Sequence, residues 1–174
     1  IIPRGRALGM VMRLPEGDRI SHSRAKLIAD LQVACGGRIA EELTFGEEMI
    51  TTGASSDIRM VTDMSRRMVT EWGMSDKLGF LAYGSDQQEV FLGHSVTQQK
   101  NLSDATAKVI DEEIRNITDT AYSDAKQILL KHADELETLA QGLLEYETLS
   151  GDEIRALLDG MPIHRESGRD DNTK

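Results

Sequence analysis

Apolar residues recur every three or four positions over most of the chain, which is the spacing of amphipathic helices. The first such stretch predicts a helix that begins at Ser21 or Ser23 and stops at Gly46. Gly36 and Gly37 lie inside it, and each costs about 1 kcal/mol relative to alanine, so we expect another helix or a loop to pack closely there. The apolar positions of this helix are Leu27, Ile28, Leu31, Ala34, Cys35, Ile39 and Leu43.

Two further long helices are predicted by the same spacing. One follows the loop GEEMITTG, with a serine cap at its start and Gly73 at its end. The other is capped by Ser103 and ends near His132. The apolar faces are Ile58, Val61, Met68, Val69 and Trp72 for the former, and Val109, Ile110, Ile114, Ile117, Ala121, Ala125 and Ile128 for the latter.

Two shorter amphipathic helices complete the predicted bundle. One carries Leu136, Leu139, Ala140, Leu143 and Leu144. Ser150 and Glu153 form a capping box before the other, whose apolar positions are Ile154, Leu157 and Leu158. Short connections between consecutive helices favour a hairpin-like bundle. Residues 161–174 have no apolar stripe, and we expect a disordered tail there.

A small β component is predicted in two places. Leu8, Met10, Met12 and Leu14 alternate with other residues, which is typical of a strand. The apolar stretches GFLAYG and EVFLG flank the polar turn SDQQ and indicate a hairpin or loop pair around residues 78–93. The fold class expected is therefore mainly α: a helical bundle with a small β component near the N-terminus and around residues 78–93.

Composition agrees with one helical domain. The 174 residues are 39% hydrophobic but only 4% aromatic, with eight methionines, so the core is expected to consist of aliphatic side chains and methionine. Cys35 is the single cysteine and cannot form an internal disulfide. A small buried thiol suits its apolar helical face, and a reducing compartment is the natural interpretation.

The net charge of −10 is concentrated in residues 101–160, which contain fourteen acidic and five basic residues. Such a surface would repel phosphate backbones, so we expect no nucleic-acid partner. The acidic excess is interpreted as the solvated face of long helices, with an acidic docking surface as the alternative. No apolar run approaches the roughly 20 residues of a membrane helix. Because the chain begins with Ile1, we expect it to be part of a longer protein.

Motif rules find no complete active site. The four histidines, at positions 22, 94, 132 and 164, are not paired at metal-ligand spacing, and HExxH, nucleophile-elbow and phosphate-loop motifs are absent from the sequence.

Asp57 is the one carboxylate whose position suggests a metal ligand. If Ser55 or Ser56 takes the N-cap, Asp57 projects from the positive end of a helix, which favours the ionised form that a metal ligand needs. A first-turn acid that only complements the helix dipole is the alternative. Glu41 and Glu42 are likewise either surface carboxylates or partners of a metal ligand.

The segments IIPRGRALG, GGRIAEELTFG, TTGASSDI and RRMVTEWGMSDKLG resemble, in this order and spacing, the FtsH family of membrane-anchored AAA+ zinc metalloproteases. The resemblance extends to about residue 160 through YGSDQQEVFLG and TLSGDEIRALL. It implies that residues 1–160 are the C-terminal part of the zinc metallopeptidase domain. The family's HExxH helix, with two zinc-binding histidines and the general-base glutamate, is expected upstream of Ile1.

The resemblance also assigns roles to residues of this chain. Asp57 is expected to be the third zinc ligand, and Glu41 to lie beside the zinc site, where it could orient a ligand histidine. The predicted strand is expected to be the edge along which unfolded substrate adds by backbone hydrogen bonding. Its residues are Ala7, Leu8, Gly9, Met10, Val11 and Met12.

The function implied by the resemblance is ATP-dependent endoproteolysis of unfolded and membrane proteins by a homo-hexamer. ATP and Mg would be bound by an ATPase module outside this chain, and the membrane anchor would also lie outside it. The bacterial inner membrane, facing the cytoplasm, is the expected location of the parent, with this piece itself soluble. Alone, the chain is expected to be inactive, since it holds one of three zinc ligands. The alternative is a non-catalytic helical oligomerisation or interaction module.

Overall fold

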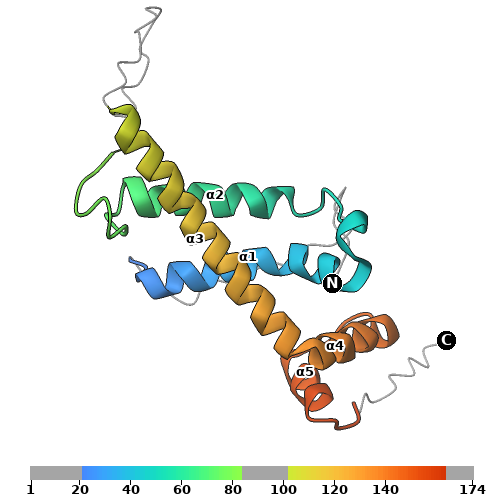
Figure 1. The fold of residues 1–174 in the computed structure, drawn as a ribbon. Coiled ribbons are helices and arrows are strands. Elements are labelled where there is room, and N and C mark those ends of the chain that lie inside the picture. Colours follow the sequence, from blue (N-terminus) through green and yellow to red (C-terminus); the bar gives the residue numbers. More distant parts are fainter. Residues whose placement is uncertain (1–20, 84–101, 164–174) are drawn as a thin grey trace, which may run out of the picture. The chain divides into compact units, whose positions relative to one another are not determined.

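The computed structural model describes residues 21–83 and 102–163, and these are mainly helical (Figure 1). They fall into two compact units, one up to Leu129 and one from Leu130 onward. The predicted strand at residues 7–12 and the tail from residue 164 lie outside the described residues. The elements are α1 (Arg24–Phe45), the 3-10 helix η1 (Glu47–Met49), α2 (Ser55–Thr70), α3 (Asp104–Lys131), α4 (Ala133–Tyr146) and α5 (Gly151–Leu158).

The predicted ends of α1 are confirmed. The Ser23 side chain accepts a hydrogen bond from the Lys26 backbone N–H, which caps the first turn. At the other end Gly46 adopts a φ of +83°, and its N–H donates to the Glu42 carbonyl. The helix therefore stops where a residue without a side chain can leave the helical path.

The predicted close packing at Gly36 and Gly37 is wrong for the described part of the chain. A Cβ atom placed on either glycine would find no described atom within 4 Å. The helices α2 and α3 instead pack on the face of α1 that carries Leu31, Ala34 and Cys35. The glycines weaken α1 locally without any contact in the described residues that requires them.

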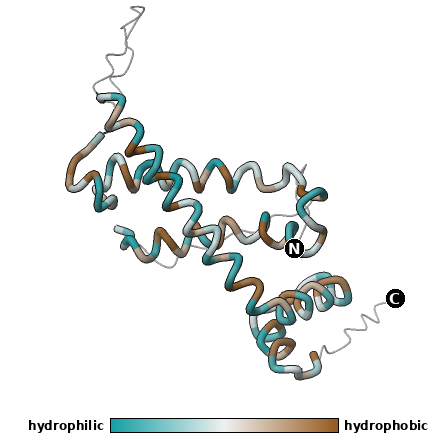
Figure 2. The backbone as a smooth tube through the Cα atoms, in the orientation of Figure 1, coloured by the Kyte–Doolittle hydropathy of each residue, from teal (hydrophilic) through white to brown (hydrophobic). Residues whose placement is uncertain are grey.

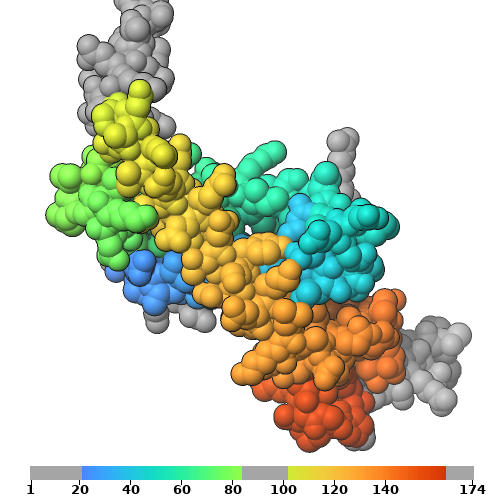
Figure 3. Space-filling model, viewed as in Figure 1, coloured from blue at the N-terminus to red at the C-terminus, as the bar shows by residue number. Residues whose placement is uncertain are grey.

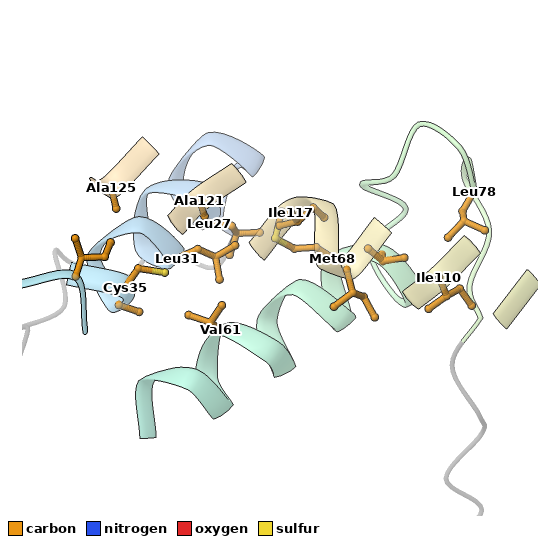
Figure 4. Close-up of a cluster of buried hydrophobic side chains, with 14 residues drawn as sticks. Leu27, Leu31, Cys35, Val61, Met68, Leu78, Ile110, Ile117, Ala121 and Ala125 are labelled. Atoms are coloured by element: carbon orange, nitrogen blue, oxygen red, sulfur yellow. The ribbon is translucent and has the colours of Figure 1, made fainter. Parts of the chain in front are cut away.

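Helices α1, α2 and α3 share one hydrophobic core, and the segment after α2 adds Leu78 to it (Figure 4). Hydrophobic and hydrophilic positions alternate along each helix (Figure 2), so that one stripe of each can be buried. Two predicted stripe positions are exposed instead: Ile58 in the first turn of α2 is 50% exposed and Ile128 near the end of α3 is 53% exposed. The buried members are Leu27, Leu31, Ala34, Cys35, Ile39, Val61, Met68, Val69, Leu78, Ile110, Ile114, Ile117, Ala121 and Ala125.

Of the predicted hairpin or loop pair, the described residues 78–83 form a loop and contain no strand, so the β component is not supported there. The backbone hydrogen bonds of this segment go elsewhere: the Gly79 N–H donates to the Ser75 carbonyl, and the Tyr83 N–H donates to the Thr70 carbonyl at 2.7 Å. The segment therefore lies against the end of α2 and has no strand partner there. Residues 84–93 of the predicted hairpin lie outside the described residues.

A buried carboxylate fastens this segment to α3. Glu113 is only 6% exposed; its Oε2 accepts a hydrogen bond from the Ser75 hydroxyl at 2.7 Å, and its Oε1 lies 2.8 Å from the Lys77 ammonium nitrogen. The hydrogen bond and charge of Lys77, together with the Ser75 hydroxyl, lower the pKa of Glu113 below its ordinary value of 4.5. Glu113 is thus ionised at neutral pH, with one oxygen hydrogen-bonded to Ser75 and the other ion-paired with Lys77.

This pairing predicts an acid-sensitive contribution to stability. A carboxyl group whose pKa is lowered by folding stabilises the folded state above the unfolded pKa, and that stabilisation is lost as the pH falls through the folded pKa. We expect the free energy of unfolding to fall as the pH drops below the ordinary glutamate pKa of 4.5, and to fall less steeply in Glu113→Gln. Urea titrations at several pH values, followed by circular dichroism, would measure both slopes; parallel slopes would contradict the assignment.

Helices α4 and α5 form a separate pair. The capping box predicted for Ser150 and Glu153 is confirmed, with both of its hydrogen bonds present. Gly142 is a point of close contact between them, because a Cβ atom there would lie 2.9 Å from Cδ1 of Leu157. Leu144 is 78% exposed, so the predicted stripe of α4 is only partly covered. Within the described ranges, no helix combines the length and the apolar composition needed to cross a bilayer.

Candidate metal ligand and adjoining cavity

Asp57 lies in the first turn of α2, as predicted, although the cap differs from the prediction. Ala54 rather than a serine is the N-cap, because the Ser55 hydroxyl donates to the Thr52 carbonyl oxygen at 2.5 Å. The Asp57 carboxylate is partly exposed and forms no hydrogen bond or ion pair with the described residues. The N-terminal end of a helix stabilises an anion, so this carboxylate is available as an oxygen donor.

Glu41 holds the turn that leads into α2. Its Oε1 accepts a hydrogen bond from the Thr51 hydroxyl at 2.6 Å, and its Oε2 accepts one from the Thr51 N–H at 3.3 Å. The Thr51 hydroxyl oxygen in turn accepts from the Gly53 N–H at 3.2 Å. The side-chain hydrogen bond from Thr51, followed by the backbone one, lowers the pKa of Glu41. Glu41 therefore connects the end of α1 to the turn just before Asp57.

A cavity of about 250 Å³ lies between α1, α2 and α3, and Asp57 forms part of its wall. The space-filling view shows a gap between α2 and α3 (Figure 3). Aliphatic side chains and a thiol form one part of the lining, and hydroxyl and charged groups form the rest. The lining residues are Ala34, Cys35, Arg38, Ala54, Asp57, Ile58, Val61, Thr62, Thr118, Asp119 and Tyr122.

Cys35 faces this cavity as a neutral thiol. Burial raises its pKa, and the negative charge of Asp57 raises it further. The second effect requires the Asp57 carboxylate to be near the thiol, which agrees with both residues lining one cavity. Cys35 is 8% exposed, so its predicted burial is confirmed. A neutral buried thiol contributes an apolar surface here and is a poor nucleophile.

Tyr122 is fixed in the cavity wall by an ion-paired carboxylate. Its hydroxyl donates to Oε2 of Glu42, while the Lys126 ammonium donates to Oε1 of the same carboxylate. Burial and the bond to Glu42 raise the pKa of Tyr122 to about 12. Glu42 thus joins α1 to α3, and no metal is needed to explain it. Tyr122 was not found by sequence reasoning, since Glu42 and Tyr122 are 80 positions apart and no motif joins them.

The described residues supply one donor and not a complete metal site. They contain no group of three or more histidine, cysteine or acidic side chains placed to hold a metal ion. His22 is exposed, and Nδ1 of His132 lies 2.8 Å from a Glu135 carboxylate oxygen. Zinc sites in enzymes use three protein ligands, of which an aspartate oxygen can be one. Asp57 fits such a site only if two further donors come from outside the described residues.

Comparison with known proteins gives consistent matches. A model described as peptidase family M41 matches residues 1–157. The ATP-dependent zinc metalloprotease FtsH of Caulobacter vibrioides is 54% identical over 166 residues, which is 95% of this chain and 26% of that protein. Proteins of the same name from Rickettsia bellii and Haemophilus influenzae are 51% and 47% identical, covering 95% and 97% of this chain and 26% of each relative. The chain spans about a quarter of the length of these relatives.

Proposed function

This chain belongs to peptidase family M41, and from that membership we propose that it is the C-terminal part of an ATP-dependent zinc endopeptidase. The observation that carries the proposal is Asp57: a carboxylate at the start of α2 without a hydrogen-bond or ion-pair partner among the described residues, in a chain whose residues 1–157 match a peptidase family. The printed names of the relatives, each an ATP-dependent zinc metalloprotease, support the activity and the metal. Residues 1–160 then form part of the peptidase domain.

In this proposal Asp57 is the third protein ligand of the zinc, beside two histidines of an upstream HExxH helix. When bound, zinc would supply Lewis-acid chemistry for peptide-bond hydrolysis. Glu41 positions the donor from a distance, since it holds Thr51 and hence the turn before α2. The expected contact of Glu41 with a ligand histidine stays a prediction.

The parts of the function that lie outside the described residues rest on the family alone. Unfolded and membrane proteins would be the substrates, and they would add along the edge formed by residues 7–12. The working form would be a homo-hexamer with ATP and Mg in a separate module and a separate membrane anchor, on the cytoplasmic side of a bacterial inner membrane. The bacterial origin of the relatives named above supports this location.

A reconstitution experiment tests the proposed function. The whole protein that contains this chain should degrade casein, an unfolded protein, only when ATP is present. A strong zinc chelator should stop degradation, and added zinc should restore it. A whole protein that binds no zinc and degrades nothing would instead favour a helical interaction module.

The turn before α2 gives a second test with a matched pair of variants. Thr51→Val removes the hydroxyl that joins Glu41 to Gly53, whereas the neighbouring exposed Thr52 uses only its backbone carbonyl in this turn. Loss of groups that hold a metal ligand costs about 10- to 100-fold in affinity. We therefore expect zinc affinity of the whole protein to fall about tenfold or more in Thr51→Val and to be unchanged in Thr52→Val. Competition with a chromogenic chelator measures both, and equal affinities would show that the turn does not position Asp57.

A further inference from the structure

A groove of about 410 Å³ lies on the α4–α5 pair, and none of its lining residues has a role in the function proposed above. We propose that it is a docking site for an extended segment of a partner protein. In that segment one bulky apolar side chain is flanked, two residues to either side, by lysine or arginine. Docking of this kind needs neither zinc nor ATP, so the inference goes beyond the proposed function.

The floor of the groove is apolar. Gly142 of α4 has no side chain, and a Cβ atom there would lie 2.9 Å from Cδ1 of Leu157, so the two helices are in direct contact at this point. Met161, Pro162 and Ile163 extend the apolar lining, and Met161 is 53% exposed. An apolar side chain that enters the groove would remove this surface from water, which favours binding.

The rim of the groove is acidic. Glu137 and Glu145 line it, and the described lining contains no basic residue. One Glu137 oxygen accepts a hydrogen bond from the Gln141 amide at 2.7 Å, but neither carboxylate forms an ion pair within the described part of the chain. Basic side chains of a partner would supply the missing positive charges.

The charge around the groove has the same sign. Residues 130–163 contain eight acidic and two basic residues. A surface of this kind attracts a basic segment and raises its rate of association, whereas it repels an acidic or phosphorylated one. The charge therefore selects the partner, and the apolar floor supplies the place where its central side chain is buried.

The spacing of the two carboxylates indicates how the partner is arranged. Glu137 and Glu145 are eight positions apart on one helix, which corresponds to about 12 Å. In an extended chain four residues span about 13 Å, and every second side chain points to the same side. Basic residues at the first and fifth positions, with an apolar residue at the third, would thus meet both carboxylates and the floor.

The polar part of the lining favours an extended partner over a helical one. Thr138 and Gln141 add hydroxyl and amide groups beside the apolar floor. These groups can form hydrogen bonds with the backbone of an extended segment, whereas the backbone groups of a helix are already bonded to each other. A cavity of about 150 Å³ is enough for benzene, so about 410 Å³ leaves room for a phenylalanine side chain and adjoining backbone.

A set of labelled peptides tests the chemistry of the partner. Fluorescence anisotropy measures binding of the peptide GSKSFSKSG to the whole protein without ATP. We expect it to bind about tenfold more tightly than GSESFSESG, which reverses the charge, and than GSKSGSKSG, which lacks the apolar side chain. The rearranged peptide GSKKSFSSG has the same composition but adjacent lysines, and should bind about threefold more weakly than GSKSFSKSG.

Variants of α4 test the location. Glu137→Gln combined with Glu145→Gln should weaken binding of GSKSFSKSG about tenfold. Glu135→Gln is the matched control, because Glu135 is exposed on the same helix but does not line the groove. Gln141→Trp should fill the groove and remove the preference for phenylalanine over glycine, whereas Leu144→Trp, at an exposed position outside the lining, should not.

Equal affinity for GSKSFSKSG and GSKKSFSSG, or a loss in Glu135→Gln as large as in the double variant, would overturn the inference. Two other occupants would also overturn it. Binding that appears only after residues 164–174 are deleted would mean that the chain's own tail fills the groove. A change of assembly mass by light scattering in Gln141→Trp would mean that the groove is a contact between copies of this chain. Absence of zinc-dependent proteolysis would contradict the proposed function and leave the docking site intact.

Discussion

Asp57→Ala is expected to abolish proteolysis by the whole protein while its ATPase activity persists. Removing a residue that only supports a metal ligand already costs about 10- to 100-fold in affinity or activity, so loss of the ligand itself should exceed about 100-fold. The physical reason is that the described residues contain no group of three or more histidine, cysteine or acidic side chains that could hold the metal without Asp57. Zinc content and casein degradation would be measured on the same preparation.

Asp63→Ala is the matched control for this prediction. Asp63 lies on the same helix and is exposed, but it does not line the cavity beside Asp57. Its replacement should leave zinc content and proteolysis unchanged. Equal zinc occupancy in the Asp57 and Asp63 variants would remove Asp57 from the metal site.

Leu31→Ala is expected to cause a large loss of stability. Leu31 is 0% exposed and belongs to the cluster shared by α1, α2 and α3. Truncating a fully buried leucine lowers the free energy of unfolding by about 2–5 kcal/mol, since apolar contacts are lost and a cavity remains. Trp72, the single tryptophan, packs against this cluster, so its fluorescence in a urea titration reports the unfolding of this unit and not of α4 and α5.

Val33→Ala on the same helix controls for the local effect of alanine. Val33 is 54% exposed, so its replacement should change the free energy of unfolding by no more than about 0.5 kcal/mol. A Leu31→Ala variant as stable as Val33→Ala would mean that the three helices do not share the core described for them.

Much of the fold could be predicted because its signals are local. Helical spacing of apolar residues predicted the five α-helices of the described ranges, and side-chain caps at Ser23, Ser103 and Ser150 correctly marked the starts of α1, α3 and α5. Both signals depend on residues within one or two helical turns of each other. They are therefore readable from a single sequence.

The predictions that were wrong concern local features that depend on contacts with distant parts of the chain. The Ser55 hydroxyl could either cap α2 or form a hydrogen bond with the preceding loop. It donates to the Thr52 carbonyl oxygen of that loop and therefore does not cap the helix. The residues after Gly79 have an apolar pattern that suits a strand, but the nearest backbone partner of Tyr83 is the end of α2. Glycines inside α1 suggested a close neighbour that the described residues do not supply.

In the candidate site, too, one part could be predicted from local sequence and another part could not. Asp57 could be predicted as the candidate ligand from the sequence, since its segment resembles a family motif and a helix start is predicted beside it. The bond from Glu41 to Thr51 spans ten positions, and the one from Tyr122 to Glu42 spans 80. No periodicity links such pairs, so the positioning of Asp57 and the cavity beside it required the folded structure.

A crystal structure of the whole protein, with zinc located by its anomalous scattering, tests the central claim most directly. We expect an Asp57 carboxylate oxygen at about 2.0–2.2 Å from the zinc ion, with two histidine nitrogens from outside this chain as the other protein ligands. A zinc ion held by a different acid such as Glu41, with Asp57 uncoordinated, would contradict the account.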